Sequence, residues 1–138
     1  MSQTPSQQNA YACRQFIPTL HTTPYPAIDP SLTKHPSPYI VYIIGGHGAA
    51  GGELARSYAR AGAVGIILTT RNLQSLETTA QEARTINRKA TVLVTEYDIT
   101  FNSSVEALAR TTQATFNSHL NTVIVNSGIP GPIHRYYP

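Results

Sequence analysis

Four short apolar runs alternate with longer amphipathic segments over residues 39–125. The first run, at residues 39–44, is a nearly continuous series of β-branched and aromatic residues, typical of a strand buried on both faces. Similar runs follow at residues 65–69, 90–95 and 122–125. We therefore expect four strands, separated by helices.

The segments between the runs carry helix patterns. Residues 53–60 are good helix formers followed by Gly62, which favours a helix end. Asn72 can cap a helix extending to about residue 88, and Ser103 with Glu106 forms a capping box for a third helix. Their predicted core-facing residues are Leu73, Leu76, Ala80, Ala83 and Ile86 in one, and Val105, Leu108, Ala109, Thr112 and Phe116 in the other. This alternation indicates an α/β fold with a parallel sheet in the order βαβαβαβ.

The chain divides into an arm, a domain and a tail. Residues 1–38 hold seven of the ten prolines and show no helical or strand period, so we expect an arm there. Residues 39–130 form the predicted domain, and residues 131–138 a short tail. A length of 138 residues suits about one domain.

Composition excludes several classes of protein. The net charge is +3 and no basic run is present, so we expect no nucleic-acid partner. No run approaches 18 apolar residues and the first residues show no leader pattern, so we expect a cytoplasmic protein without a membrane partner. The single cysteine, Cys13, excludes an intramolecular disulfide framework, and the histidines lack metal-ligand spacing, so no metal site is predicted.

The candidate chemistry lies where the first predicted strand turns into the following helix. Residues 45–52 contain five glycines, which permit a tight turn and close approach of the backbone to a pyrophosphate. The helix start then offers free N–H groups to the anion. A plain structural turn is the alternative. His47 within it either contacts a phosphate or ribose or is simply an exposed turn residue.

The spacing of these residues resembles the TGxxxGxG turn of the short-chain dehydrogenases/reductases. Three further motifs agree in order: Arg71 stands after the second strand, where NADP-preferring members carry a basic residue; Asp98-Ile99 resembles the Asp-Val pair whose aspartate meets the adenine; and Asn126-Ser127-Gly128 resembles the Asn-Ala-Gly that lines the cofactor cleft. The resemblance implies the N-terminal half of a Rossmann-like, doubly wound parallel sheet. The cofactor-binding residues it implies are Gly45, Gly46, His47, Gly48, Ala50, Gly51, Arg71, Asp98, Ile99, Asn126, Ser127 and Gly128.

Three positions depart from the family pattern. Ile44 replaces the usual threonine, Ala49 the middle glycine, and Val125 the first asparagine of N-N-A-G. The methyl group of Ala49 lies where the backbone approaches the pyrophosphate, so some loss of affinity is expected.

The end of the second strand indicates which cofactor is preferred. An acidic residue there binds the ribose 2′-hydroxyl of NAD, whereas an arginine accommodates the 2′-phosphate of NADP. Here the sequence is Thr69-Thr70-Arg71, so we expect NADP, with NAD less favoured. The alternatives are that Arg71 is merely solvated and Asp98 is a turn residue.

The family's catalytic pair is missing. Its reaction uses a tyrosine as general acid/base and a lysine four residues later. Lys34 and Lys89 are the only lysines, and neither follows a tyrosine at that spacing, so no catalytic residue is assigned. We expect a truncated form of an oxidoreductase that interconverts a small-molecule ketone and secondary alcohol. The alternatives are an inactive nucleotide-binding half-domain and a non-functional remnant. The fourth strand would form an exposed edge, which predicts self-association.

Overall fold

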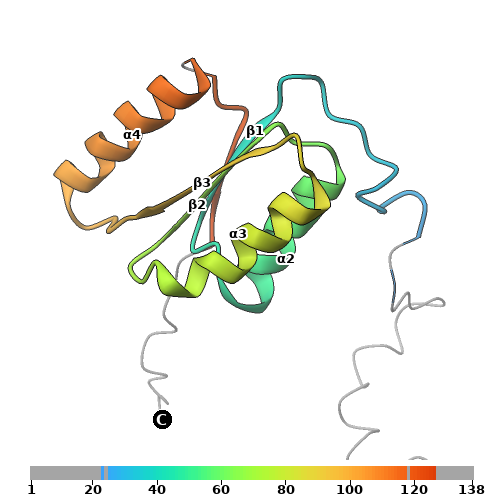
Figure 1. Ribbon diagram of the computed structural model, residues 1–138, viewed down its shortest axis with the longest axis horizontal. Coiled ribbons are helices and arrows are strands. Elements are labelled where there is room, and N and C mark those ends of the chain that lie inside the picture. Colours follow the sequence, from blue (N-terminus) through green and yellow to red (C-terminus); the bar gives the residue numbers. More distant parts are fainter. Residues whose placement is uncertain (1–22, 24, 118, 127–138) are drawn as a thin grey trace, which may run out of the picture.

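The computed structural model describes residues 23, 25–117 and 119–126, and Figure 1 shows their arrangement. In chain order the elements are β1 (Ile40–Ile44), α2 (Gly48–Arg60), β2 (Gly65–Thr70), α3 (Gln74–Ile86), β3 (Thr91–Glu96), α4 (Asn102–Phe116) and β4 (Thr122–Val125). The predicted alternation is confirmed, and each strand begins and ends within one residue of its predicted bounds.

The strands form one parallel sheet in the order β3-β2-β1-β4. Ile44, which ends β1, pairs with Thr69 of β2 and with Val125 of β4. The carboxyl ends of the strands therefore lie along one edge of the sheet. Because β4 returns to the far side of β1, the order reverses there, and such a reversal opens a crevice outside the strand ends.

Helices cover both faces of the sheet: α2 and α3 lie on one side and α4 on the other (Figure 1). Successive strand residues point to opposite faces, so β1 and β2 supply two core layers. The layer beneath α2 and α3 contains Val41, Ile43, Ala55, Ile66, Leu68, Leu76 and Ala80, and the layer beneath α4 contains Ile40, Tyr42, Ile44, Ile67, Tyr97 and Leu108. This core is the N-terminal half of a Rossmann-like sheet.

Helix α2 begins earlier than predicted. It starts at Gly48 instead of residue 53, so Gly48, Gly51 and Gly52 belong to the helix. The prediction placed them in a loop because glycine has a low helix propensity. The helix ends where predicted, just before Gly62, which has a φ of 83°.

The capping predictions had mixed outcomes. Leu73, and not Asn72, occupies the N-cap position of α3, but the Asn72 Oδ1 does accept a hydrogen bond from the Gln74 N–H at 3.1 Å. The capping box of Ser103 and Glu106 is wrong, because α4 begins at Asn102 and no side chain caps its first turn. The hydroxyl oxygen of Ser104 instead accepts a hydrogen bond from the Asp98 N–H at 3.1 Å.

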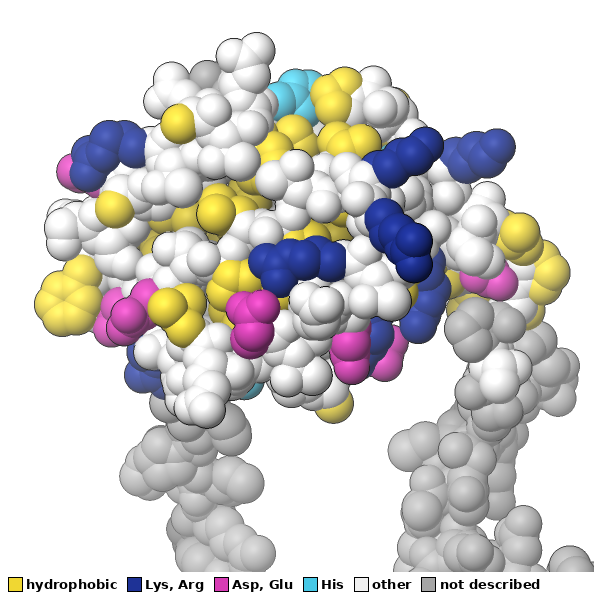
Figure 2. Space-filling view, viewed as in Figure 1, with side chains coloured by type: hydrophobic (Ala, Val, Ile, Leu, Met, Phe, Trp, Pro, Cys, Tyr) yellow, Lys and Arg dark blue, Asp and Glu magenta, His cyan; other side chains and the backbone are white. Residues whose placement is uncertain are grey.

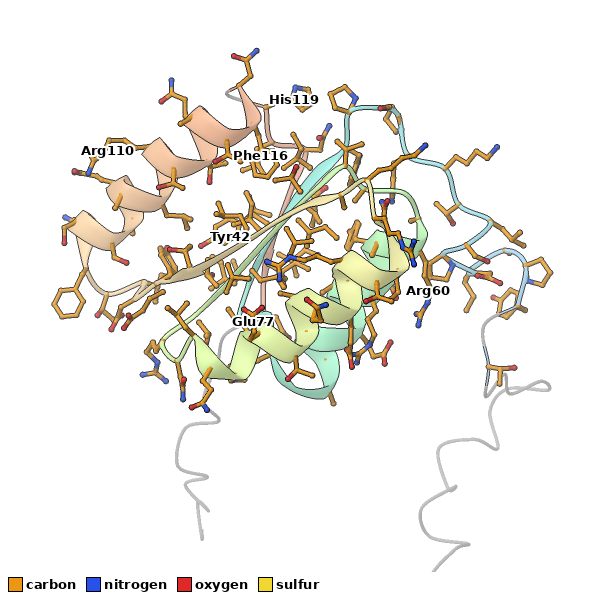
Figure 3. The ribbon with its side chains drawn as sticks, viewed as in Figure 1. Tyr42, Arg60, Glu77, Arg110, Phe116 and His119 are labelled. Atoms are coloured by element: carbon orange, nitrogen blue, oxygen red, sulfur yellow. The ribbon has the colours of Figure 1, made fainter. Side chains whose placement is uncertain are left out.

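The predicted core faces of α3 and α4 are only partly correct. Leu73 and Ile86 are 43% and 38% exposed, whereas Leu76, Ala80 and Ala83 are buried. In α4 only Leu108 is buried, and Val105 is 41% exposed. Figure 3 shows Tyr42 and Phe116 between α4 and the sheet and Arg110 on the outer side. Among the described residues, none covers the flank of α4 beside β4, so Val105 and Ala109, two of the five residues of its predicted face, are exposed.

Candidate nucleotide-binding site

The turn between β1 and α2 is fixed to the neighbouring strand. The N–H groups of Gly45 and Gly46 donate to the Thr69 carbonyl oxygen at 2.9 and 3.2 Å. Gly45 and Gly48 have φ values of 75° and 72°, a left-handed conformation that other residues rarely adopt. Glycine at these two positions is therefore required by the backbone itself.

Helix α2 approaches this turn so closely that Gly51 has no room for a side chain. A Cβ atom at Gly51 would lie 2.2 Å from the Gly45 carbonyl oxygen and 2.8 Å from the Gly46 carbonyl carbon. The opening N–H groups of α2 are thus brought to the carboxyl edge of the sheet. A helix start supplies unpaired donors and a partial positive charge, which suit a phosphate.

Asn126 ties the end of β4 to this turn. Its side-chain Nδ2 donates to the Gly45 carbonyl oxygen at 3.0 Å, and its backbone N–H donates to the Ile44 carbonyl oxygen at 2.9 Å. The two strand ends are held together on the side of β1 opposite β2. Ser127 and Gly128, which complete the predicted motif, lie outside the described residues.

Polar groups follow β2 as well. Arg71 is exposed directly after the strand, and no acidic residue stands beside it in the sequence. Asn72 accepts the Gln74 N–H, and the Ser75 hydroxyl donates to the Asn72 carbonyl oxygen at 2.7 Å. The side chain of Arg71 thus stands next to an ordered first turn of α3.

Asp98 follows β3 and is held by its own turn. Its Oδ1 accepts hydrogen bonds from the Thr100 N–H at 2.9 Å and the Thr100 hydroxyl at 2.7 Å. These bonds lower the pKa of Asp98 below the usual aspartate range, and the positive charge of Arg71 adds to them while partial burial opposes them. The carboxylate is therefore anionic at neutral pH and can accept further hydrogen bonds.

The ends of the four strands surround one cleft of about 550 Å³. The cleft is lined by Ile44, Gly45, His47, Thr69, Thr70, Arg71, Asn72, Ser75, Tyr97, Asp98, Ile99, Thr100 and Asn126. Six of the predicted residues are among them: Gly45, His47, Arg71, Asp98, Ile99 and Asn126. Gly46, Gly48, Ala50 and Gly51 do not line the cleft but shape the turn and helix behind it.

The sequence prediction missed several residues of the cleft wall. The sequence analysis gives Asn72 and Ser75 no binding role, although both lie within four residues of Arg71, at the end of β2. Tyr97 and Thr100 flank Asp98 in the same way. Each of these four residues lies close to the carboxyl end of a strand. That position could have indicated a place in the cleft wall, because the register of the parallel sheet brings the carboxyl ends together.

The buried tyrosine beneath the cleft is unsuited to acid/base chemistry. Tyr42 accepts a hydrogen bond from the Thr69 hydroxyl at 3.3 Å and packs edge-on against Tyr97. Burial raises the pKa of Tyr42, whereas a tyrosine acting as a general base needs a lowered pKa. Tyr42 is therefore a residue of the core and not a candidate general base.

Two absences apply to the residues that the structure describes. No three His, Cys, Asp or Glu side chains gather there as metal ligands would. Within the same ranges, no helix has both the length and the apolar character needed to span a bilayer.

Figure 2 shows hydrophobic side chains in the middle of one face, with charged side chains of both signs around them.

A second, apolar groove lies on the α4 face and adjoins the cleft, since Ile44 and Tyr97 line both. It measures about 520 Å³, and its lining includes Tyr42, Val105, Leu108, Leu120 and Val123. Strand β4 is at the edge of the sheet, and its Val123 and Val125 are 51% and 62% exposed. The exposed edge expected from the sequence is thus present among the described residues.

Comparison with known proteins agrees with this geometry. The short chain dehydrogenase family profile matches residues 39–137. Short chain dehydrogenase pgmD of Aspergillus terreus is 31% identical over 134 residues, covering 93% of this chain and 42% of pgmD. The same-named protein of Aspergillus terreus strain NIH 2624 is 30% identical with the same coverage. The chain thus spans less than half the length of these relatives.

Solved structures share the fold. A D-mannonate oxidoreductase from Haemophilus influenza, solved with bound NAD, has a TM-score of 0.63 at 15% identity, covering 75% of this chain and 35% of that one. A short-chain dehydrogenase/reductase from Burkholderia xenovorans has a TM-score of 0.60 at 25% identity, covering 68% of this chain and 38% of that one.

The sheet order, the glycine turn and the cleft at the strand ends define a Rossmann-like nucleotide-binding protein. More narrowly, the matched profile covers most of the 138 residues, and the chain belongs to the short-chain dehydrogenase family. Members of this family are NAD(P)-dependent oxidoreductases that act on small molecules.

Proposed function

We propose that the cleft binds NADP(H) and that this chain is the cofactor-binding half of an oxidoreductase. The observation that carries the proposal is the contact between α2 and the glycine turn, where Gly51 leaves space for nothing larger than hydrogen. That close approach brings helix donors to the carboxyl edge of a parallel sheet, where dinucleotide phosphates bind. The residues present therefore fit the phosphates of a dinucleotide.

Each part of the cofactor has a matching part of the cleft. The unpaired N–H groups at the start of α2, from Gly48 to Ala50, would receive the pyrophosphate, and Gly45, Gly46 and Gly51 would shape the turn that brings them there. Arg71 would pair with the 2′-phosphate through charge-assisted hydrogen bonds. Asp98 would accept a hydrogen bond from the adenine amino group and Ile99 would cover the ring. Asn126, with Ser127 and Gly128, would border the nicotinamide end.

The preference for NADP over NAD rests on the end of β2. A carboxylate there would bind a ribose 2′-hydroxyl but repel a phosphate. The structure has Arg71 at this position, and Asp98, the one acidic residue lining the cleft, is held by Thr100 at the end of β3. These charges favour the extra phosphate of NADP.

When bound, the cofactor supplies the hydride that interconverts a ketone and a secondary alcohol. This chain's own residues would bind and orient it, but its 138 residues contain no tyrosine with a lysine four positions later. We therefore expect this chain alone to turn over no carbonyl substrate. A nucleotide-binding protein without turnover is the second candidate function, and the missing pair is the observation that favours it.

The experiment is a titration of the purified chain with NADPH and with NADH, repeated for Arg71→Ala. We expect NADPH to bind more tightly than NADH and Arg71→Ala to weaken NADPH roughly tenfold, because a charged hydrogen bond is lost, while NADH changes little. Arg110→Ala is the matched control, since Arg110 is exposed on α4 and pairs only with Glu106 at 3.5 Å in the described part of the chain. Equal losses for both cofactors would refute the role of Arg71.

A further inference from the structure

The described part of the N-terminal arm lies against the domain. Residues 25–38 form a strap that lies along the last turns of α2 (blue in Figure 1). Strap and helix border a small cavity of about 180 Å³, whose lining includes Ile28, Pro30 and His35 from the strap and Ser57 and Tyr58 from the helix. This proline-rich segment therefore has a defined place at the end of α2 that lies away from the glycine turn.

Asp29 organises the middle of the strap. Its Oδ1 accepts hydrogen bonds from the Ser31 N–H at 2.9 Å and from the Ser31 hydroxyl at 2.7 Å. These bonds, and to a smaller extent the positive charge of Arg60, lower the pKa of Asp29. Arg60 is the last residue of α2 and lies next to the strap (Figure 3). Opposite charges thus favour the position of the strap beside the helix end.

Three stacked rings join the strap to the domain. The His35 ring lies 3.9 Å from the ring of Tyr39, directly before β1, and 5.7 Å from the ring of Tyr58, in the last turn of α2. Tyr39 and Tyr58 lie 6.1 Å apart and pack, partly buried, against the core. The Tyr39 hydroxyl is 2.6 Å from the Thr122 hydroxyl at the start of β4. We call the rings of His35, Tyr39 and Tyr58 the aromatic clasp.

The unit of β1 and α2 is thus closed at both ends. At the carboxyl edge of the sheet, Gly51 lies against the Gly45 carbonyl oxygen. At the amino edge, His35 contacts both the residue before β1 and the last turn of α2. The 13 residues of α2 span about 20 Å, so movement of its last turn about the Gly51 contact also tilts its first turn.

We propose that the aromatic clasp holds the phosphate-binding start of α2 in place, with His35 as a positioning residue, so that strap closure and cofactor binding favour each other. The inference rests on the proposed function and gives the arm a part in it. His35 acts from the amino edge and contacts no part of the cofactor. Because coupling between two sites is reciprocal, the factor by which closure tightens NADPH binding equals the factor by which NADPH favours closure.

Trypsin measures opening of the strap in the intact chain. Lys34 directly precedes His35, and cleavage after Lys34 follows the population in which the strap is released. Cleavage in the exposed turn of Arg88 and Lys89, between α3 and β3, reports the general stabilisation that any bound ligand brings. We expect saturating NADPH to slow cleavage after Lys34 roughly threefold more than cleavage in this turn, and mass spectrometry of the fragments separates the two.

His35→Ala removes the ring from the strap and leaves Tyr39 and Tyr58 in place. We expect cleavage after Lys34 to become roughly three- to tenfold faster, because the stacking contacts are lost, and the additional protection by NADPH to disappear. NADPH binding should weaken by the same factor as the protection that is lost. His35→Phe keeps a stacking ring and should match the wild type. His119→Ala, which removes an exposed imidazole after α4, should match it too.

The outcomes separate the two proposals. Equal protection of the two cleavage sites in the wild type would overturn the coupling, and this comparison needs no substitution. Unchanged cleavage of His35→Ala, or faster cleavage with unchanged NADPH affinity, would also overturn it, and NADP(H) binding itself would stand. No NADPH binding by the wild-type chain would overturn the proposed function, and this inference with it.

Discussion

Gly51 is the residue on which the proposed cofactor site depends most. Its missing side chain lets α2 lie against the carbonyl oxygen of Gly45, which in turn accepts the amide of Asn126. Gly52 is also buried, but a Cβ there would meet only the flexible guanidinium of Arg56, at 3.2 Å. Two adjacent glycines thus have different reasons to be present.

This difference gives a matched pair of substitutions. We expect Gly51→Ala to lower the free energy of unfolding by about 3 kcal/mol or more and to abolish NADPH binding, because the methyl group meets backbone atoms. Gly52→Ala should stay within about 1 kcal/mol of the wild type, since the guanidinium can shift and alanine favours the helix. Chemical denaturation and NADPH titration of both variants measure this. Comparable stability of the two variants would contradict the close contact.

The residues of the cleft differ in how far the sequence could identify them. Gly45 was identified from the glycine-rich turn between a strand and a helix, and Arg71 and Asp98 from the resemblance to the short-chain dehydrogenases/reductases. Asn72 and Thr100 were missed because the Asn72 side chain bonds to the Gln74 backbone and the Thr100 hydroxyl to the Asp98 carboxylate, which are ordinary local bonds of a turn.

Among the elements, the connection from β3 to α4 depends on ionisation of Asp98. The carboxylate holds Thr100, while the Asp98 N–H is bonded to Ser104 in the first turn of α4. The folded-state pKa of Asp98 is lowered, so the unfolded chain binds a proton more readily. This contribution to stability is present at neutral pH and lost as pH falls below about 4.

Replacement of Asp98 tests this dependence. We expect Asp98→Asn to show a smaller fall in melting temperature between pH 6 and pH 3 than the wild type, because asparagine can accept the Thr100 bonds without titrating. Thermal unfolding by circular dichroism across this range provides the measurement. Glu106→Gln, which changes an exposed carboxylate on α4, serves as the control and should follow the wild-type curve. An equal fall in melting temperature for Asp98→Asn and the wild type would contradict a stabilising role for the Asp98 carboxylate.

Hydrophobic periodicity predicted the elements well and their ends less well. The strands were located because β1 and β2 are buried on both faces and consist of continuous apolar residues. The start of α2 was misplaced because tertiary contact at Gly51 outweighs glycine's poor propensity. The buried extent of the apolar face of α4 was overestimated, because an apolar stripe on a helix does not show whether another element will pack against all of it.

At the scale of the whole molecule, the described sheet is open at β4. Val123 and Val125 are exposed beside the apolar groove, and an unpaired edge strand offers N–H and C=O groups to another chain. The relatives are more than twice as long as the matched region, since 134 residues cover 42% of pgmD. The exposed edge and groove are the parts of this half-sheet that most favour association.

We therefore expect the 138-residue chain to self-associate through β4. Size-exclusion chromatography with light scattering should show species larger than a monomer. Substituting lysine at Val123 and Val125 should shift the protein to the monomer, because charges on an edge strand oppose pairing. Lysines at Thr111 and Thr115, on the exposed surface of α4, add the same charge and should leave the association unchanged. A wild-type monomer would show that the edge does not pair.

The central claim is that a dinucleotide lies across the strand ends of this chain. Amide chemical shifts in a nitrogen–proton NMR spectrum, followed during an NADPH titration, test it most directly. We predict saturable shifts at Gly45, Gly46, Arg71, Asp98 and Asn126. We predict none at Thr78, Glu82 and Thr85, which line a separate groove that α3 forms with Arg56 of α2. A folded spectrum in which the first group does not move, or in which only the second group does, would contradict the claim.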